Sequence, residues 1–258
     1  FQVSLQTLPR VCKLLQHLHT LKKFGGWALF FLIALVVLGP LLWVFMSSLK
    51  PSTSILTSPF GTEGFPHWAN YKAAWTEAKI GRAAVNSVIV CFVSLAILLP
   101  IGSMAAYALA RMPFWGRNGI RTLFLGGLMF PNFLAVVPLF LMMGRWQLNE
   151  TLIGLILVYV AYSLSFTIFV MSGFFETLPK ELEEAAQMDG ASTSRVFWRV
   201  MLPLAKPGLI VAGIFNFIGL WNEYNLAKVL VSGDNATLPI GLANLTVSQF
   251  YKSDYGAL

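Results

Sequence analysis

Long runs without a charged residue constrain this chain more than any other feature. Trp27–Met46, Ala83–Ala110, Thr122–Met143 and Thr151–Phe175 contain no Asp, Glu, Lys or Arg. As an α-helix, the first of these runs is about 30 Å long, enough to cross the hydrocarbon core of a bilayer. Only a helix or a closed barrel can satisfy the backbone of such a segment in lipid. The sequence therefore predicts an all-α, polytopic membrane protein.

Composition supports this class and excludes others. Hydrophobic residues make up 57% of the chain and charged residues 11%, with a mean hydropathy of +0.70. Soluble proteins carry about 25% charged residues. The net charge of +7 is the Lys and Arg excess of cytoplasmic loops, so we expect no nucleic-acid partner. The distant Cys12 and Cys91 form no disulfide framework and no metal-binding cluster with the three histidines, so no metal site is predicted.

We expect five spans, at about 27–46, 85–110, 122–143, 151–175 and 205–231. An amphipathic segment over 1–26 precedes them and carries basic residues but no acid. The loop between the second and third spans is likewise basic, with three Arg residues in Arg111–Arg121. The positive-inside rule places both segments in the cytoplasm. The loop 47–84 then faces outward and the segment 176–203 faces the cytoplasm. Basic residues of the outer loop, such as Arg82, could suit a phosphorylated solute, which remains an alternative to a neutral sugar.

The cytoplasmic segment between the last two spans has the densest charge cluster of the chain. Its pattern predicts two short helices: Pro179 and three glutamates open the first, and Gly190 ends it. Ser192 is expected to cap a second helix that runs to about Met201, and Pro203 and Pro207 to close the segment. Apolar residues there indicate docking onto lipid, the helix bundle or a partner protein: Phe197, Trp198 and Met201. The alternative is an interfacial helix pair with ordinary capping acids.

The same segment resembles a known family. Glu184-Ala185-Ala186, then Gly190, then Val200-Met201-Leu202-Pro203 match the "EAA…G…I-x-L-P" loop of binding-protein-dependent ABC importer permeases, with Val200 in place of the usual Ile. Further stretches resemble the carbohydrate-uptake branch, above all the maltose-type second permease subunit: "SLKPSTSIL", "NYKAAW", "AYALARMPFWGR", "LWNEYNLA" and "TLPIGL".

The resemblance implies a permease domain over 27–258 with the segment 176–203 as its coupling loop. Permeases of this family have six core spans, and the sixth is expected to begin near Tyr255, where the sequence stops, so either the sequence stops early or the homologue is truncated. The loop would sit in a groove of an ATP-binding subunit, with Glu184 and Asp189 against basic or polar groups and the apolar residues filling the socket. The coupling residues would be Glu184, Ala185, Ala186, Asp189, Gly190, Ala191, Phe197, Leu202 and Pro203.

The resemblance also implies the partners and the location. They are a pair of ATP-binding cassette subunits, a second permease subunit in a heterodimer, an external solute-binding protein that touches 47–84 and the C-terminal tail, and the lipid bilayer of a prokaryotic inner membrane. The chain itself has no Gly-x-x-x-x-Gly-Lys-Ser/Thr run, so ATP and Mg²⁺ belong on the partner subunits and no cofactor is expected here. We expect a non-catalytic subunit of an ATP-driven sugar importer that works by alternating access.

Polar residues within the spans are candidates for the transport pathway. Glu223 follows Lys206 by too few residues to clear the hydrocarbon core, so it lies in the membrane or at its outer interface, where a charge faces protein or water. The pathway or gate candidates are Glu223, Asn222, Asn216, Asn132 and Tyr162. The alternative for Glu223 is a salt bridge or helix cap, and for Asn132, beside Pro131 and Pro138, a kink. An ion-coupled secondary transporter using Glu223 is the competing function, but it leaves the coupling loop unexplained.

Overall fold

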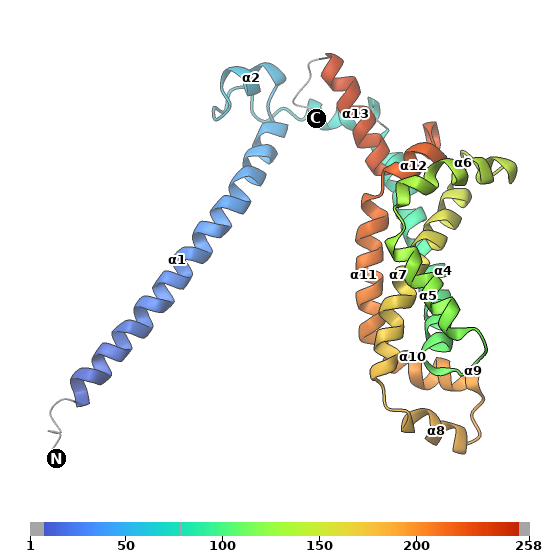
Figure 1. Cartoon of the computed structure of the whole chain (residues 1–258). Coiled ribbons are helices and arrows are strands. Elements are labelled where there is room, and N and C mark those ends of the chain that lie inside the picture. Colours follow the sequence, from blue (N-terminus) through green and yellow to red (C-terminus); the bar gives the residue numbers. More distant parts are fainter. Residues whose placement is uncertain (1–7, 78, 253–258) are drawn as a thin grey trace. The chain divides into compact units, whose positions relative to one another are not determined.

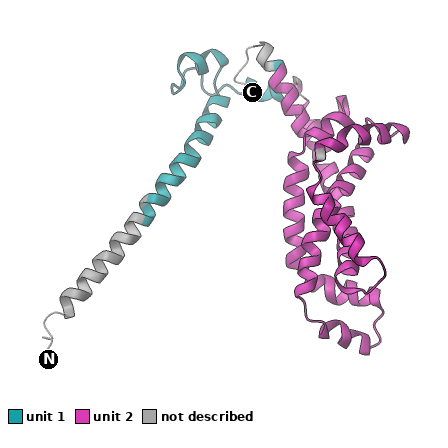
Figure 2. Cartoon of the chain, viewed as in Figure 1, with its two compact units in different colours: residues 1–74, 248–258 teal, residues 75–247 magenta. Residues whose placement is uncertain are grey.

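The computed structural model describes residues 8–77 and 79–252, and side chains within these ranges except at 8–25, 28, 77, 132 and 249–252. Every regular element in the described part is helical. The chain divides into two compact units, Phe1–Ala74 with Ser248–Leu258 and Trp75–Val247 (Figure 2). We take each unit by itself and call them unit 1 and unit 2.

Unit 1 is dominated by one long helix, α1 Leu8–Ser48 (Figure 1). The helix runs without a break past the predicted boundary at residue 26, and Pro40 lies inside it. The amphipathic character predicted for 1–26 falls on residues and side chains outside those described. From Leu29 onward α1 is long and apolar enough to span a membrane. Its side chains there are exposed, as with Phe31 at 70%, so the helix presents apolar groups all round, as a lipid-facing span does.

The loop after α1 contains α2 Ser52–Thr57 and α3 Ala69–Glu77. Side chains tie it to the end of α1. The Asn70 amide donates to the carbonyls of Ser48 and Lys50, at 2.9 and 2.8 Å. The Lys50 side chain is buried and its Nζ donates to the Pro59 carbonyl at 2.9 Å. These bonds order a loop rich in proline.

Unit 2 is built on three helices that pack together: α4 Ile80–Arg111, α7 Leu152–Thr177 and α11 Lys206–Asn222 (Figure 1). Small residues allow the close approach. A Cβ added at Gly102 of α4 would lie 2.5 Å from Thr167 Cγ2 of α7, so only glycine fits there. Two buried clusters fill the bundle. One surrounds Leu98, Leu155 and Tyr159, and the other surrounds Tyr107, Phe175 and Phe197.

The third predicted span, 122–143, is not one helix. It consists of α5 Arg117–Met129, the 3-10 turn η1 Asn132–Ala135 and α6 Val136–Arg145, with a bend of 97° between the two α-helices. Phe130 is extended, the conformation favoured before proline, and Pro131 has no N–H to continue the helix. The proline therefore breaks this span, which is a larger effect than a kink.

The fifth predicted span, 205–231, is longer than the helix that the structure has there. The helix α11 ends at Asn222, and Glu223 is extended. The chain continues as α12 Asn225–Leu230, η3 Gly233–Asn235 and α13 Leu238–Lys252. The reason is that Glu223 caps α12 and so ends α11.

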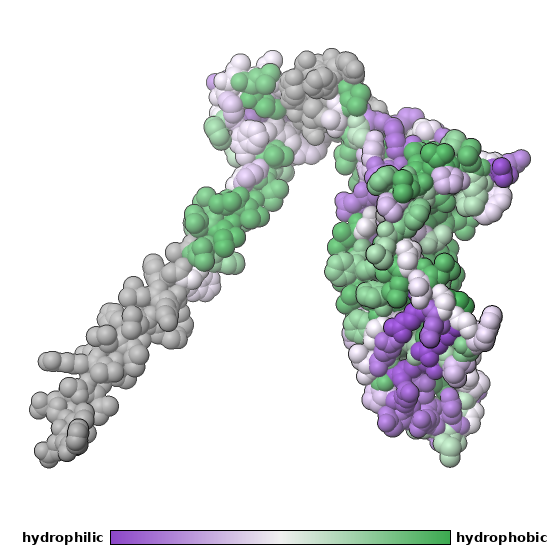
Figure 3. Space-filling model, viewed as in Figure 1, coloured by the Kyte–Doolittle hydropathy of each residue, from purple (hydrophilic) through white to green (hydrophobic). Residues whose placement is uncertain are grey.

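Three described helices are long and apolar enough to cross a membrane, or up to five if each bent pair is one span. The second bent pair joins Thr193–Leu204 to α11 at 73°. Figure 3 shows an apolar surface along the middle of unit 2 and a hydrophilic one at the end that carries α8 and α9. This distribution suits a bundle that passes through a bilayer.

Candidate functional site

The coupling loop predicted over 176–203 is a chain of short helices at one end of unit 2. It comprises α8 Glu181–Met188, α9 Thr193–Val196, the π-helical turn η2 Phe197–Met201 and α10 Leu202–Leu204. Gly190 separates α8 from α9 with a φ of +79°, the left-handed region that favours glycine. Ser192 occupies the cap position of α9 in an extended conformation, but its side chain makes no cap bond. The predicted bend is present and the predicted serine cap is not.

Helix α8 has two different faces. Three glutamates occupy its first turn, where they complement the helix dipole. Glu184 and Met188 lie one turn apart on the exposed face, and Met188 is 88% exposed. Glu183 and Ala186 lie on the other face, which is partly buried. Adjacent glutamates therefore serve opposite sides of the helix.

Arg111 holds the inner face of α8 against the bundle. Its side chain is 5% exposed, and its Nε lies 3.3 Å from Glu183 Oε1. The N–H and the oxygen are not aligned as a hydrogen bond, so this contact is an electrostatic pair. The other end of the guanidinium donates to the carbonyls of Phe175, at 2.6 Å, and Leu178. One arginine thus joins the end of α4, the end of α7 and α8.

The carboxyl group of Glu183 responds to two opposing influences. Burial raises its pKa above the ordinary value, while the positive charges of Arg111 and Lys180 lower it, and burial is the larger effect. The fold therefore keeps the carboxylate of Glu183 beside Arg111 although burial removes part of its hydration.

The aromatic part of the loop points inward. Phe197 is 4% exposed and Met201 is fully buried. The Phe197 ring lies 5.2 Å from that of Tyr107 and 6.3 Å from that of Phe175, centroid to centroid. The expectation that Phe197 fills a partner's socket is therefore wrong, because the chain's own bundle already surrounds it. Trp198, next to it, is 46% exposed.

The last part of the loop leads directly into α11. Pro203 lies within α10 and does not close the loop as predicted, while Pro207 stands in the first turn of α11, where its missing N–H costs nothing. The change of direction occurs at Ala205, which is buried. Leu202 and Ala191 pack partly buried against the same cluster as Phe197.

Glu223 is held by three hydrogen-bond donors. Its carboxylate accepts from the hydroxyl of Tyr159 at 2.9 Å, from Leu226 N at 2.8 Å and from Ala227 N at 3.0 Å. The two backbone bonds cap α12, and the tyrosine bond joins this cap to α7. The geometry is that of the helix-cap alternative.

The asparagines of α11 have different roles. Asn216 is buried, and its amide donates to Thr167 Oγ1 at 2.9 Å and to the Ala212 carbonyl at 2.8 Å, so it joins α11 to α7. Asn222 donates to the Ile218 carbonyl of its own helix at 2.8 Å. Tyr162 is 43% exposed.

Two cavities bring most of the pathway candidates together. One, of about 350 Å³, has Tyr162, Asn216 and Glu223 in its wall. The other, of about 510 Å³, has Tyr162, Asn222 and Glu223 in its wall. The cavities share Tyr162 and Glu223. The fifth candidate, Asn132, has a side chain outside those described, although its neighbours Pro131 and Phe133 line the larger cavity.

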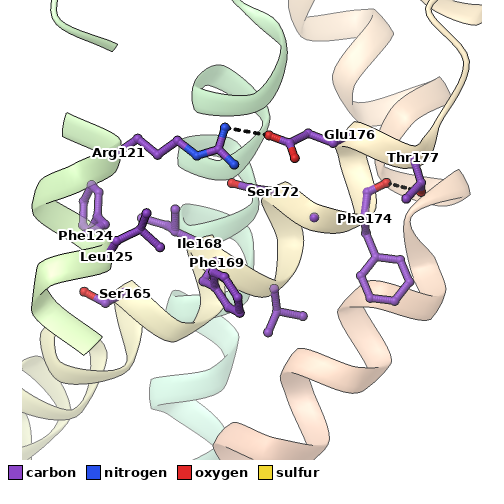
Figure 4. A pocket seen from close by; sticks show the side chains of 12 residues that line it. Arg121, Phe124, Leu125, Ser165, Ile168, Phe169, Ser172, Phe174, Glu176 and Thr177 are labelled. Carbon is purple, nitrogen blue, oxygen red and sulfur yellow. Dashed lines mark hydrogen bonds and ion pairs between the residues drawn. The ribbon is translucent and has the colours of Figure 1, made fainter. Parts of the chain in front are cut away.

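A third cavity, of about 390 Å³, lies between α5 and α7 (Figure 4). Its wall is mostly apolar, and the side chain of Arg121 extends from α5 to Glu176 on α7, with 2.8 Å between Nη1 and Oε1. The ion pair satisfies the two charges of this cavity, and none of the four pathway candidates whose side chains are described lines it.

Opposite charges also meet at the start of α4. Lys79 and Arg82 approach the carboxylate of Asp234 to 2.9 and 3.0 Å. The bond from Lys79 and the charge of Arg82 lower the pKa of Asp234. Arg82 is therefore already paired within the chain, which weakens the case for a phosphorylated solute. Within the described residues, no group of His, Cys, Asp and Glu could hold a metal ion.

Residues 98–252 match the family described as "Binding-protein-dependent transport system inner membrane component". This chain belongs to that family. Among its relatives is the diacetylchitobiose uptake system permease protein NgcG of Streptomyces coelicolor, 47% identical over 232 residues, or 90% of this chain and 77% of the relative. The trehalose transport system permease protein SugB of Mycobacterium tuberculosis is 36% identical over 222 residues, or 85% of this chain and 80% of the relative.

A solved structure shows the same fold as this permease. It is a bacterial ABC transporter involved in the import of the acidic polysaccharide alginate, with a TM-score of 0.74 and 21% identity. The match covers 92% of this chain and 88% of the other. Membership of the family and the apolar helices make the chain a multi-pass membrane permease of the ABC type.

Sequence reasoning did not assign a role at the predicted coupling loop to three residues: Arg111, Glu183 and Met188. Arg111 is the first charge after a long uncharged run, and Glu183 is next to the motif glutamate, but nothing local shows that they meet. Met188 had a usable signal, because it lies one helical turn from Glu184 and shares its exposed face.

Proposed function

We propose that this permease is a transmembrane subunit of an ATP-driven sugar importer and that α8 couples it to a separate ATPase. The observation that carries the proposal is the two-faced geometry of α8. One face is ion-paired to the bundle through Glu183 and Arg111, and the other exposes Glu184 and Met188. A helix fixed on one side and free on the other can transmit the motion of a partner to the bundle.

The residues that would contact the ATPase follow from this arrangement. Glu184 and Asp189 are exposed carboxylates, and Met188 is a flexible apolar side chain suited to an irregular socket. Ala185 lies on the same exposed face. ATP and Mg²⁺ would be bound by a pair of ATPase subunits, and this chain would carry no cofactor and catalyse no reaction.

A sugar is the proposed cargo because the relatives' names include a diacetylchitobiose and a trehalose transport protein. A second permease subunit would complete the pathway, and an external solute-binding protein would deliver the sugar. The N-terminus would lie in the cytoplasm of a prokaryotic cell, on the same side as the coupling loop. This orientation rests on the excess of Lys and Arg in 1–26 and 111–121.

Alternating access is the proposed mechanism. Closure of the ATPase pair would move α8 and, through Arg111, the ends of α4 and α7. To change a two-state equilibrium from 1:99 to 99:1, ATP must supply about 5.5 kcal/mol of differential binding. The ion-coupled alternative needs a free carboxylate, but Glu223 is engaged by three donors.

The test is a charge reversal on the exposed face of α8. In the purified complex, Glu184→Arg should release the ATPase subunit and abolish ATP-dependent sugar uptake into proteoliposomes. The matched control for retention of the ATPase subunit is Glu63→Arg, an exposed glutamate of the loop after α1, which lies on the predicted outer side. Retention of the ATPase and full uptake in Glu184→Arg would contradict the proposal. Uptake that needs an ion gradient and no ATP would favour the secondary transporter.

A further inference from the structure

The 350 Å³ cavity combines an aromatic wall with a few polar groups. Tyr162 and Phe166 come from α7, and Phe215 comes from α11. The Phe166 and Phe215 rings lie 6.1 Å apart at 64°, an edge-to-face pair that holds each ring in place. Ser163, Ser165 and Asn216 add hydroxyl and amide groups to the same wall.

This combination suits a sugar better than lipid. Polar side chains within membrane spans are costly against hydrocarbon, so this face is expected to border water, protein or a polar ligand. Small-molecule sites are concave, of about 300–1,000 Å³, mostly apolar and aromatic, with a few placed polar groups. A pyranose ring matches both parts, because its C–H face packs on aromatic rings while its hydroxyl groups need hydrogen-bond partners.

One glycine in the cavity wall is surrounded by open space. A Cβ built at Gly219 of α11 meets no atom within 4 Å, and Gly219 lines the cavity. By contrast, Gly208 of the same helix abuts Phe174, with 2.5 Å between the built Cβ and Cγ. Gly208 is therefore needed for packing, whereas Gly219 leaves room that the bundle itself does not use.

We propose that the cavity walled by Tyr162, Phe166, Phe215 and Asn216 is a subsite for one pyranose ring of the transported sugar, and that Gly219 keeps it open. The proposal rests on the proposed function, since it places the cargo of that importer on this chain. The ring lies against the aromatic side chains, and the hydroxyl groups of Ser163 and Ser165 exchange hydrogen bonds with those of the sugar. A larger side chain at 219 occupies the place of the ring.

The first experiment fills the cavity in steps. Gly219→Ala and Gly219→Leu are made in the assembled importer, and uptake of trehalose and of diacetylchitobiose is measured with ATP. One added methylene in a pocket changes selection by about 10–200-fold, so uptake should fall in the order glycine, alanine, leucine, by more than about tenfold for leucine. The matched control is Gly173→Leu, because Gly173 lines the Arg121–Glu176 cavity and its built Cβ also meets nothing within 4 Å.

The second experiment tests whether a sugar or a segment of a partner protein occupies the cavity. Gly219→Cys, in a background with Cys12→Ser and Cys91→Ser, is labelled with a small thiol reagent in the assembled complex. Trehalose or diacetylchitobiose should slow the labelling of Cys at 219 and leave labelling at a Gly173→Cys control unchanged. Labelling blocked by the second permease subunit with or without sugar would mean that a partner helix fills the cavity, and would overturn the subsite.

The outcomes distinguish the two proposals. If the unaltered complex shows no ATP-dependent uptake of any sugar, the proposed function fails. If the unaltered complex takes up sugar and Gly219→Leu does so equally well, only the subsite fails. A Gly219→Leu variant that does not assemble leaves the labelling of Gly219→Cys to decide, since a small side chain fits the open space.

Discussion

Two regions of unit 2 hold their polar side chains in different ways. At the coupling end, Tyr107, Phe175 and Phe197 fill the space between α4, α7 and the loop, and a buried arginine ties the three together. Farther along α7 and α11, two cavities remain, with polar side chains in their walls. In the proposed function, the ion-paired contact at Arg111 would transmit the displacement of α8, whereas the cavities with polar walls would accept the sugar.

Two glutamates express the same contrast. Glu183 faces a guanidinium and Glu223 faces three neutral donors. Loss of a buried charge's partner is costly, because the remaining charge has neither water nor a counterion. Loss of neutral bonds costs less. Substitutions at the two places should therefore lower the free energy of unfolding by different amounts. The four predictions below run from the largest effect to the smallest.

Arg111→Ala should be the most damaging change. It leaves Glu183 without its cation and the Phe175 and Leu178 carbonyls without their donor, at a cost of about 3–5 kcal/mol for the broken pair. Arg111→Lys keeps the charge but loses the fork geometry, so it should lie in between. Thermal unfolding of the purified complex measures both, with Arg117→Ala as control, since Arg117 bonds the carbonyls of Leu109 and Ala110 without an acid. Equal melting of Arg111→Ala and Arg117→Ala would refute the special role of the three-way contact.

Glu223→Ala should cost about 1–3 kcal/mol, because Tyr159 loses its acceptor and α12 loses its cap. Glu223→Gln keeps one acceptor oxygen but turns its amide NH2 toward a remaining donor, so its stability should lie between those of the unaltered protein and the alanine variant. Urea unfolding of the complex provides the comparison. If the glutamine variant were as unstable as the alanine variant, the charge and not the cap would be what matters at this position.

The pH dependence of the coupling end has a definite sign. The folded-state pKa of Glu183 is raised, so the folded protein binds its proton more readily than the unfolded chain. Stability from this group is therefore greatest below its ordinary pKa of about 4.3 and falls as pH rises through the raised value. Melting temperatures of the unaltered protein and of Glu183→Gln, measured from acid to neutral pH, should diverge with this sign. A divergence of opposite sign would mean that Arg111 outweighs burial.

Asp234→Asn should have the smallest effect. Its two ion pairs are exposed, and salt screens such pairs. Because the pKa of Asp234 is lowered, the stability from its charge is present above the ordinary value of about 3.9 and is lost as pH falls through the lowered value. The melting difference between variant and unaltered protein should disappear at high salt. A difference as large as that of Arg111→Ala would show that these exposed pairs hold α4 in place.

The sequence located most helices because uncharged length is a property of consecutive residues. Local signals also placed the turn at Gly190 and the start of the fifth span, predicted at 205 and observed at Lys206. The predictions failed where contacts between residues far apart in the chain determine the structure. The end of α11 at Asn222 depends on Glu223 capping the next helix, and the inward direction of Phe197 depends on rings from α4 and α7. The prolines did indicate a break in the third span, but a proline's local signal does not state the angle of the bend.

The candidate site was found in outline for the same reason. A spacing motif located the coupling loop, but only the folded chain shows that Arg111 and Glu183 meet and that Tyr162, Asn216 and Glu223 surround one space. These are contacts between residues far apart in the chain, for which a single sequence has no direct signal.

The neighbouring glutamates of α8 have a consequence for genetics. A mutation of Glu183 damages a contact inside this polypeptide, so compensating mutations should arise within the same gene, at or near the codon for Arg111. A mutation of Glu184 damages a surface, so its suppressors should map to the gene of whichever protein docks there. Two adjacent codons would thus yield revertants at separate loci, and the second locus would identify the motor without any purification.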